Sequence, residues 1–339
     1  MSLFIYVGYD KFHRLAVLTL MTTGLCGCLS LDAGHRDTRT GPFSPDEVEA
    51  LYGRAKDPRA FWLTLYQDQS GPTFRGSHRL HPGQFARMPF KTPKKAYSIP
   101  VISVDSIKLS TIPALIDTSS AKSWIAVQEI SKAMLTPLSP PAFRTRAEHV
   151  NDQVDGYLCH IDNLKLNTLR IESVLTFVRG SWDGLDIIAR GVKKPVPGMV
   201  LGMQFLEPFA FVQFDFEARE VRFSADRTYK PDKELLLASA PFASASGPLQ
   251  VAGTINGKAE RIILDSAGRF DVALPYENGG ILRHLSIGDL VLRDLVISPE
   301  VTAHDAFPQP RIGLGVLSRF RMTLDSRDKV VHFERSTSR

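Results

Sequence analysis

Two stretches of the sequence share one pattern, PALIDTS at residues 113–119 and RIILDSA at residues 261–267. Each passes from apolar and β-branched residues into an aspartate, a hydroxyl residue and a small residue. The apolar run is typical of a buried strand, so the aspartate lies where a strand leaves the core. A carboxylate in such a place is costly unless other groups pair with it. The pattern therefore predicts that Asp117 and Asp265 each have dedicated polar partners.

The surroundings of the two aspartates repeat in the same order, which indicates an internal duplication. Each copy continues with an apolar strand that ends in glycine, and then with a hairpin whose aspartate precedes a phenylalanine by eight residues. These parts are MVLG at 199–202, Asp215 and Phe223 in the first copy, and IGLG at 312–315, Asp325 and Phe333 in the second. The spacing matches Leu201-Gly202 with Leu314-Gly315. Asp215 and Asp325 each precede the turn of a closing hairpin, so we expect them to cap those turns.

Short apolar runs separated by turn signals predict an all-β protein after residue 96. The chain has 339 residues, which suggests two units, and its 43% hydrophobic and 23% charged residues indicate a globular protein. We place a first lobe at 96–237, an Ala-, Ser- and Pro-rich linker at 238–248 and a second lobe at 249–339. The net charge of +5 is scattered along the sequence. That distribution favours a solvated surface and gives no reason to expect a nucleic-acid partner.

Residues 28–95 predict a tether followed by a short helical and irregular segment. Ser44-Pro45-Asp46-Glu47 has the pattern of a capping box, which predicts a helix to Leu51. A second helical piece is expected around residues 61–65. Residues 68–95 are rich in Gly, Pro and basic residues and are expected to be irregular, in a position where they could cover the site.

The amino terminus predicts a secretory signal over residues 1–27, with a basic flank, a short apolar run and then LCGC at 25–28. LCGC resembles a bacterial lipobox, and this resemblance implies that Cys28 carries a lipid anchor. The protein would then face the periplasm from the cell envelope, on the outer membrane by the same resemblance because Leu29 follows Cys28. An uncleaved amphipathic anchor or a misassigned start codon are the alternatives. Outside this segment the one cysteine is Cys159, which is either a buried strand residue or a nucleophile.

The two aspartate strings resemble the active-site motifs of the pepsin and retropepsin group of aspartic peptidases. The resemblance implies a two-lobed, pepsin-like acid-protease barrel (a duplicated retropepsin-like unit) with a short helical N-terminal extension. It also implies that Asp117 and Asp265 are catalytic. Five residues would support their loops: Thr118 and Ser266, which would lock the loops together, Ser120, which would lie beside Asp117, and the small residues Ser119 and Ala267. The family has glycine where this sequence has Ser119 and Ala267.

Such a pair of aspartates can cut a peptide bond, because two close carboxylates hold one proton between them. One activates a water and the other protonates the substrate carbonyl. The family covers its site with a hairpin flap, and residues 151–157 have the composition of its tip. Tyr157 is then either the flap aromatic or an ordinary strand residue. The short turn at 278–280 predicts little flap from the second lobe.

The sequence therefore predicts an aspartic endopeptidase whose partner is a peptide or protein substrate. It shows no zinc-binding helix and no phosphate-binding glycine loop, so no metal or cofactor is expected. Because both half-sites lie in one chain, a monomer suffices. Two alternatives remain: an inactive pepsin-fold lipoprotein that binds a peptide or protein partner, and a β-structural lipoprotein in which both strings are accidental.

Overall fold

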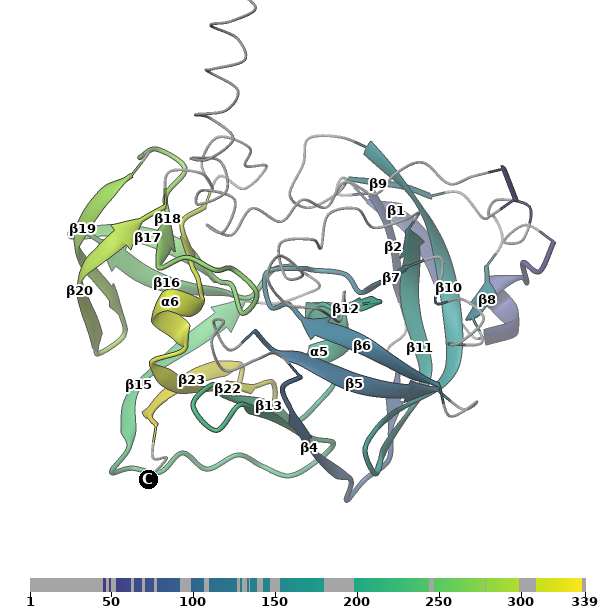
Figure 1. Cartoon of the computed structure of the whole chain (residues 1–339), viewed down its shortest axis with the longest axis horizontal. Helices are drawn as coiled ribbons and strands as arrows, with labels where there is room; N and C mark the ends of the chain where they lie inside the picture. The colour runs from purple at the N-terminus through teal and green to yellow at the C-terminus, as the bar shows by residue number, and fades with distance from the viewer. Residues whose placement is uncertain are drawn as a thin grey trace, which may run out of the picture.

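The structure is a computed structural model of the chain, in which two lobes of β-strands flank a central sheet (Figure 1). It describes residues 45–46, 49, 53–61, 64–68, 71–75, 78–91, 99–106, 110–126, 129, 133, 135–138, 143–146, 153–179, 198–243, 247–277, 279–298 and 309–336. The expected signal segment, Cys28 and the tether lie outside these ranges. The predicted all-β, two-lobed architecture is confirmed. Within the described ranges, no helix combines the length and apolar character needed to span a bilayer.

The central sheet joins the two halves of the chain and is antiparallel throughout. Its strands, in spatial order, are β15 (Leu236–Ala243), β23 (Val330–Arg335), β22 (Phe320–Asp325), β13 (Phe211–Asp215), β14 (Glu220–Ser224) and β4 (Phe85–Pro89). The middle pair, β13 and β22, places Gln213 opposite Thr323. Each half contributes an equivalent closing hairpin, so this pair marks an approximate twofold axis.

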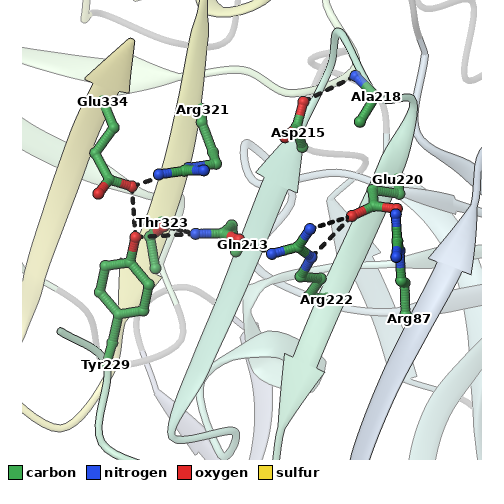
Figure 2. Close-up of polar contacts among 10 residues, drawn as sticks. All are labelled: Arg87, Gln213, Asp215, Ala218, Glu220, Arg222, Tyr229, Arg321, Thr323 and Glu334. Atoms are coloured by element: carbon green, nitrogen blue, oxygen red, sulfur yellow. Dashed lines mark hydrogen bonds and ion pairs between the residues drawn. The ribbon is translucent and has the colours of Figure 1, made fainter. Parts of the chain in front are cut away.

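The two faces of the central sheet differ in chemistry. Inward residues such as Val212, Phe223, Met322 and Phe333 belong to one continuous apolar core. The opposite face carries charged and amide side chains that pair with one another. Glu334 pairs there with Arg321, and Glu220 pairs with Arg222 (Figure 2). Strand periodicity produces this division, since successive residues point to opposite faces.

The first lobe is a curved sheet that ends next to the central sheet. Its strands are β5 (Val101–Ser106), β6 (Thr111–Ile116), β7 (Trp124–Ala126), β8 (Leu135–Pro137), β9 (Phe143–Arg146), β10 (Gln153–Leu166), β11 (Leu169–Arg179) and β12 (Met199–Leu201), followed by helix α5 (Met203–Leu206). β12 lies between β6 and β7, parallel to the first and antiparallel to the second. This insertion brings Leu201 opposite Ile116, the residue before Asp117.

The second lobe repeats this arrangement. Its strands are β16 (Gln250–Ile255), β17 (Lys258–Leu264), β18 (Val272–Ala273), β19 (Gly280–Ile287), β20 (Leu290–Ile297) and β21 (Arg311–Ile312), followed by helix α6 (Leu314–Leu317). β21 lies between β17 and β18, parallel to the first and antiparallel to the second. Asn256 and Gly257, both with positive φ, turn β16 into β17, as an Asn-Gly hairpin requires.

The segment before residue 96 is more ordered than expected. Pro45, Asp46 and Glu49 are helical, in line with the capping-box pattern. The expected helix at 61–65 is wrong, because a 3-10 turn, η1 (Pro58–Phe61), is followed by strand β1 (Thr64–Asp68). Three more strands occupy the segment expected to be irregular: β2 (Gly71–Arg75), β3 (Arg79–Leu80) and β4.

Two strands, β4 and β15, formed where the sequence predicted an irregular segment and a linker. β4 reads Phe-Ala-Arg-Met-Pro, and only Ala86 and Met88 face the core, which is too few to stand out in a basic, proline-containing stretch. The stretch at 238–248, expected to be a linker, lies largely in β15, whose Ala238 and Ala240 are buried. Small residues fit there because β15 pairs with both β23 and β16 as the chain crosses into the second lobe.

Candidate active site

The two predicted aspartates occupy equivalent positions, each on the residue after a central strand of its lobe. Asp117 follows β6, and its amide donates to the carbonyl of Leu201 at 3.0 Å. Asp265 follows β17, and its amide donates to the carbonyl of Ile312 at 2.8 Å. Their side chains are 2% and 0% exposed, respectively. Both carboxyl groups are therefore held in the interior, where they need the dedicated partners that the sequence predicted.

Reciprocal hydrogen bonds lock the two aspartate loops together. The Thr118 amide donates to Ser266 Oγ at 3.0 Å, and the Ser266 amide donates to Thr118 Oγ1 at the same distance. Each hydroxyl in turn donates to a strand-end carbonyl across the contact, Thr118 to Leu264 at 2.6 Å and Ser266 to Ile116 at 3.0 Å. Because Asp117 and Asp265 directly precede these residues, the contact brings the two half-sites to one place, as the resemblance implied.

In each carboxylate, Oδ1 accepts two hydrogen bonds from the loop that follows. Asp117 Oδ1 accepts from the Ser119 amide at 3.0 Å and from Ser119 Oγ at 2.9 Å. Asp265 Oδ1 accepts from the amides of Ala267 at 3.0 Å and Gly268 at 2.7 Å. The hydroxyl at Asp117 thus comes from Ser119. Ser120, expected beside Asp117, donates its amide to the Asp117 carbonyl at 3.2 Å and accepts a hydrogen bond from the Met203 amide at the start of α5.

Ser119 and Ala267 fit the positions where the family has glycine. Neither has a positive φ, so neither loop requires the backbone freedom of glycine at that residue. Both side chains are buried, Ser119 against Asp117. The close backbone approach occurs instead behind the loops. A Cβ on Gly202 would lie 2.3 Å from the Lys122 carbonyl oxygen, and a Cβ on Gly313 would lie 2.4 Å from that of Phe270.

This symmetry corrects one predicted match. Gly313 follows β21 as Gly202 follows β12, and each glycine immediately precedes a short helix. Leu314 and Gly315, which were matched with Leu201-Gly202, lie in α6. The equivalent pair is Ile312-Gly313, two residues earlier.

Arg311 was not predicted from the sequence. Its Nη1 lies 3.9 Å from Asp265 Oδ2, and both side chains are almost wholly buried, at 4% and 0% exposure. The guanidinium also lies over the Phe270 ring, 5.5 Å from its centroid. Arg311 pairs with Ile263 as Val200 pairs with Leu115, so the two residues occupy equivalent positions in the two lobes. An arginine in an otherwise apolar strand was the available signal, but the incorrect match of Gly315 hid it.

The predicted flap is a hairpin of β9 and β10, paired from Gln153 opposite Arg146 to Gly156 opposite Phe143. Residues 153–157 therefore belong to a strand, not to the tip, and Asn151 and Asp152 lie outside the described residues. Tyr157 is buried in β10 and pairs with Val178, as the ordinary-strand alternative expects; the flap-aromatic alternative stays a prediction. In the second lobe a bridge between Leu274 and Glu277 precedes β19, which agrees with the short turn expected there.

The remaining predictions concern residues away from the two loops. Asp215 and Asp325 accept hydrogen bonds from backbone amides of the hairpin turns that follow them, which confirms their capping role. Cys159 is a buried strand residue, and burial raises the pKa of its thiol, which disfavours the nucleophilic thiolate. In the described part of the chain, no three His, Cys, Asp or Glu side chains gather in a way that could hold a metal ion.

The comparison with solved structures agrees with this geometry. The aspartic proteinase from Irpex lacteus superposes with a TM-score of 0.50 and 13% sequence identity, over 75% of this chain and 98% of that chain. The chain has a two-lobed, pepsin-like fold. No protein-family model matches the sequence, and no curated protein matches it either. At 13% identity the pepsin-like likeness concerns the fold alone.

Proposed function

We propose that this protein is an aspartic endopeptidase that hydrolyses peptide bonds with a water activated between Asp117 and Asp265. The observation that carries the proposal is the reciprocal locking of the two loops by Thr118 and Ser266. Strands from distant parts of the chain each end in a buried aspartate, and the lock joins the loops that carry them. In a buried site, electrostatic interactions with a reacting group are stronger than in water, and the protein groups are already oriented before a substrate arrives.

In the proposed reaction the pair of aspartates carries one proton. The ionised carboxyl group removes a proton from the water as the water oxygen attacks the peptide carbonyl carbon, and the other carboxyl group protonates the carbonyl oxygen. The resulting diol collapses with cleavage of the C–N bond. The proton taken from the water passes to the leaving nitrogen, and the diol returns the second proton to the pair.

The environment of the reaction is also a proposal. The lipobox-like LCGC sequence supports a lipid anchor at Cys28 and a position in the bacterial cell envelope, facing the periplasm from the outer membrane. Peptides or proteins of that compartment are the proposed substrates. Fractionation of cells that produce a Cys28→Ser variant tests the anchor, since this variant should leave the membrane fraction. Its retention there would contradict the proposal.

A non-catalytic role as a peptide-binding module is the second candidate. Ser119 is the observation that favours it, because its hydroxyl adds to Asp117 Oδ1 a side-chain hydrogen bond that a glycine could not supply. Ala267 leaves the equivalent oxygen of Asp265 to two backbone amides. The two candidates differ in one outcome, cleavage, and share peptide binding.

Cleavage of a peptide library by the chain from residue 40 onward, between pH 3 and pH 7, separates the two candidates. Mass spectrometry of the products should show cleavage by the unmodified protein. The Asp117→Asn and Asp265→Asn variants should each lose at least a thousandfold in rate, as expected when a member of the reacting group is removed. Asp289→Asn, in an exposed turn, is the matched control and should cleave normally. Binding of peptide without cleavage at any pH would favour the module.

A further inference from the structure

The strands behind the two aspartates differ in one charge. Their loops, their backing strands and their glycines are equivalent, but the strand behind Asp117 carries Val200 where the strand behind Asp265 carries Arg311. A symmetric pair of aspartates would give the two carboxyl groups the same surroundings. Here one of them has a buried guanidinium beside it.

Arg311 and Asp265 interact through the attraction of their opposite charges. The distance of 3.9 Å from Nη1 to Oδ2 is too long for a hydrogen bond but short for two opposite charges. Both groups are shielded from water, so the attraction is screened far less than at a surface. Burying a lone cation is costly, whereas burying it beside a carboxylate offsets much of that cost. The arrangement therefore favours the ionised form of Asp265.

Other charged side chains lie on the elements around Arg311 and Asp265. On β17, Lys258 and Glu260 form an ion pair with each other at 3.2 Å, and exposed Arg261 lies on the same strand. On the loop after Asp265, Arg269 is half-buried and Asp271 lies 3.6 Å from Arg319. β18 and α6 contribute no charged residue. From the facing loop come Asp117 and Lys122, whose Nζ lies over the Phe177 ring.

We propose that Arg311 is a positioning residue that keeps Asp265 as the charged member of the pair, so that Asp117 carries its proton. This inference rests on the proposed peptidase function and deepens it. Asp265 then removes the proton from the attacking water, and Asp117 protonates the carbonyl oxygen. The roles are fixed before the substrate binds. Because the cation also eases loss of the shared proton, the pH range of cleavage lies lower than a symmetric pair would give.

The test compares Arg311→Met, Arg311→Lys and the unmodified protein in the profile of kcat/KM against pH. Arg311→Met removes the charge at similar length, and we expect both limbs of its profile to move upward by about one to three pH units. Arg311→Lys keeps the charge, so its profile should stay close to that of the unmodified protein. Arg319→Met removes a cation that pairs with Asp271 and should leave the profile in place.

A second readout is independent of cleavage. In protein labelled with carbon-13 at the aspartate carboxyl groups, the signal that disappears in Asp265→Asn should titrate at higher pH in Arg311→Met. If Arg311→Met does not fold, the comparison uses Arg311→Gln, which keeps a polar group of similar reach. Profiles and titrations that coincide with those of the unmodified protein would overturn the inference. Titrations that move in a protein that cleaves nothing would support the inference and count against the peptidase function.

Discussion

At the scale of single residues, the site depends on hydroxyl groups as much as on carboxylates. The Thr118 and Ser266 side chains each accept a hydrogen bond from the other loop and donate one to a strand end behind that loop. All four bonds are buried. A buried polar group that loses its partner costs more than the bond itself contributes, so these two residues connect the lobes strongly.

Thr118→Ala should therefore destabilise the protein by about 2–4 kcal/mol, because the Ser266 amide and the Leu264 carbonyl both lose a buried partner. Urea unfolding at pH 7 measures the effect. Thr118→Ser keeps the hydroxyl and should cost less than about 1.5 kcal/mol. Thr111→Ala removes a partly exposed hydroxyl bonded to Asp105 and should change stability by about 0.5 kcal/mol or less. Equal losses in Thr118→Ala and Thr118→Ser would contradict this account.

Local sequence revealed the residues whose roles are set by their immediate neighbours. Asp117, Thr118, Asp265 and Ser266 follow apolar strands directly, so their places in the loops could be predicted. The role of Ser119 could not, because the choice between its hydroxyl and that of Ser120 depends on how tightly the turn closes. Arg311 acts across strand pairing, about fifty residues from Asp265, and no local pattern encodes that pairing.

At the scale of elements, the polar face of the central sheet ties the chain's closing strands to the segment between the lobes (Figure 2). Glu334 on β23 accepts hydrogen bonds from the Tyr229 hydroxyl, from Arg321 Nε at 3.1 Å and from the Asp232 amide at 2.8 Å. Gln213 Nε2 lies 2.9 Å from the Tyr229 hydroxyl and 3.0 Å from Thr323 Oγ1. A buried carboxylate is thus satisfied by partners from two parts of the chain, the segment at 229–232 and β22.

The Tyr229 contact predicts a loss of stability in alkali. Burial, and then the hydrogen bond to Glu334, raise the pKa of Tyr229 to about 12, above its ordinary value of 10.0. The unfolded chain therefore releases the phenolic proton first, and stability should fall as the pH rises from about 10 to 12. Unfolding free energies measured by urea at pH 9 to 11.5 should fall less steeply in Tyr229→Phe than in the unmodified protein. Parallel curves would show that Tyr229 ionises alike in both states.

Element boundaries were predictable where alternation was long and failed where it was short. β20 alternates buried and exposed residues over most of its length, and the closing hairpins carry aspartates that mark their turns. α5 and α6 span four residues each, which is too short for a helical period to show. The sequence at 312–315 offers two glycines, Gly313 and Gly315, and only the pairing of β21 with β17 decides between them.

At the scale of the whole molecule, buried histidines oppose folding in acid. His78 packs against Phe205 and Phe209 at ring distances of 5.0 and 5.6 Å, and burial lowers its pKa to about 3. Burial also lowers the pKa values of His160 and His332, against nearby carboxylates that raise them. The folded protein thus keeps these rings neutral in a pH range where the unfolded chain binds protons to them.

Stability should accordingly fall as the pH drops from about 6.5 toward 3, and His78 should account for a measurable part of the slope. His78→Leu keeps an apolar side chain among the phenylalanines and removes the titrating group. Its unfolding free energy in urea should decline less between pH 6.5 and 4 than that of the unmodified protein. His284→Gln, in the second lobe, serves as the control. A decline in His78→Leu as steep as in the unmodified protein would contradict the assignment.

The pairing of β13 with β22 has a consequence for the order in which the chain matures. Gln213 and Thr323 meet on the approximate twofold axis although 110 residues separate them, and Thr118 meets Ser266 across 148. Contacts between such distant residues form late, after the cost of closing a long loop has been met. During synthesis the first lobe emerges well before the second, so the aspartate pair assembles only after the loop that carries Asp265 and Ser266 has left the ribosome. A chain that stalls or is cut before residue 261 would carry one complete aspartate loop and no locked pair.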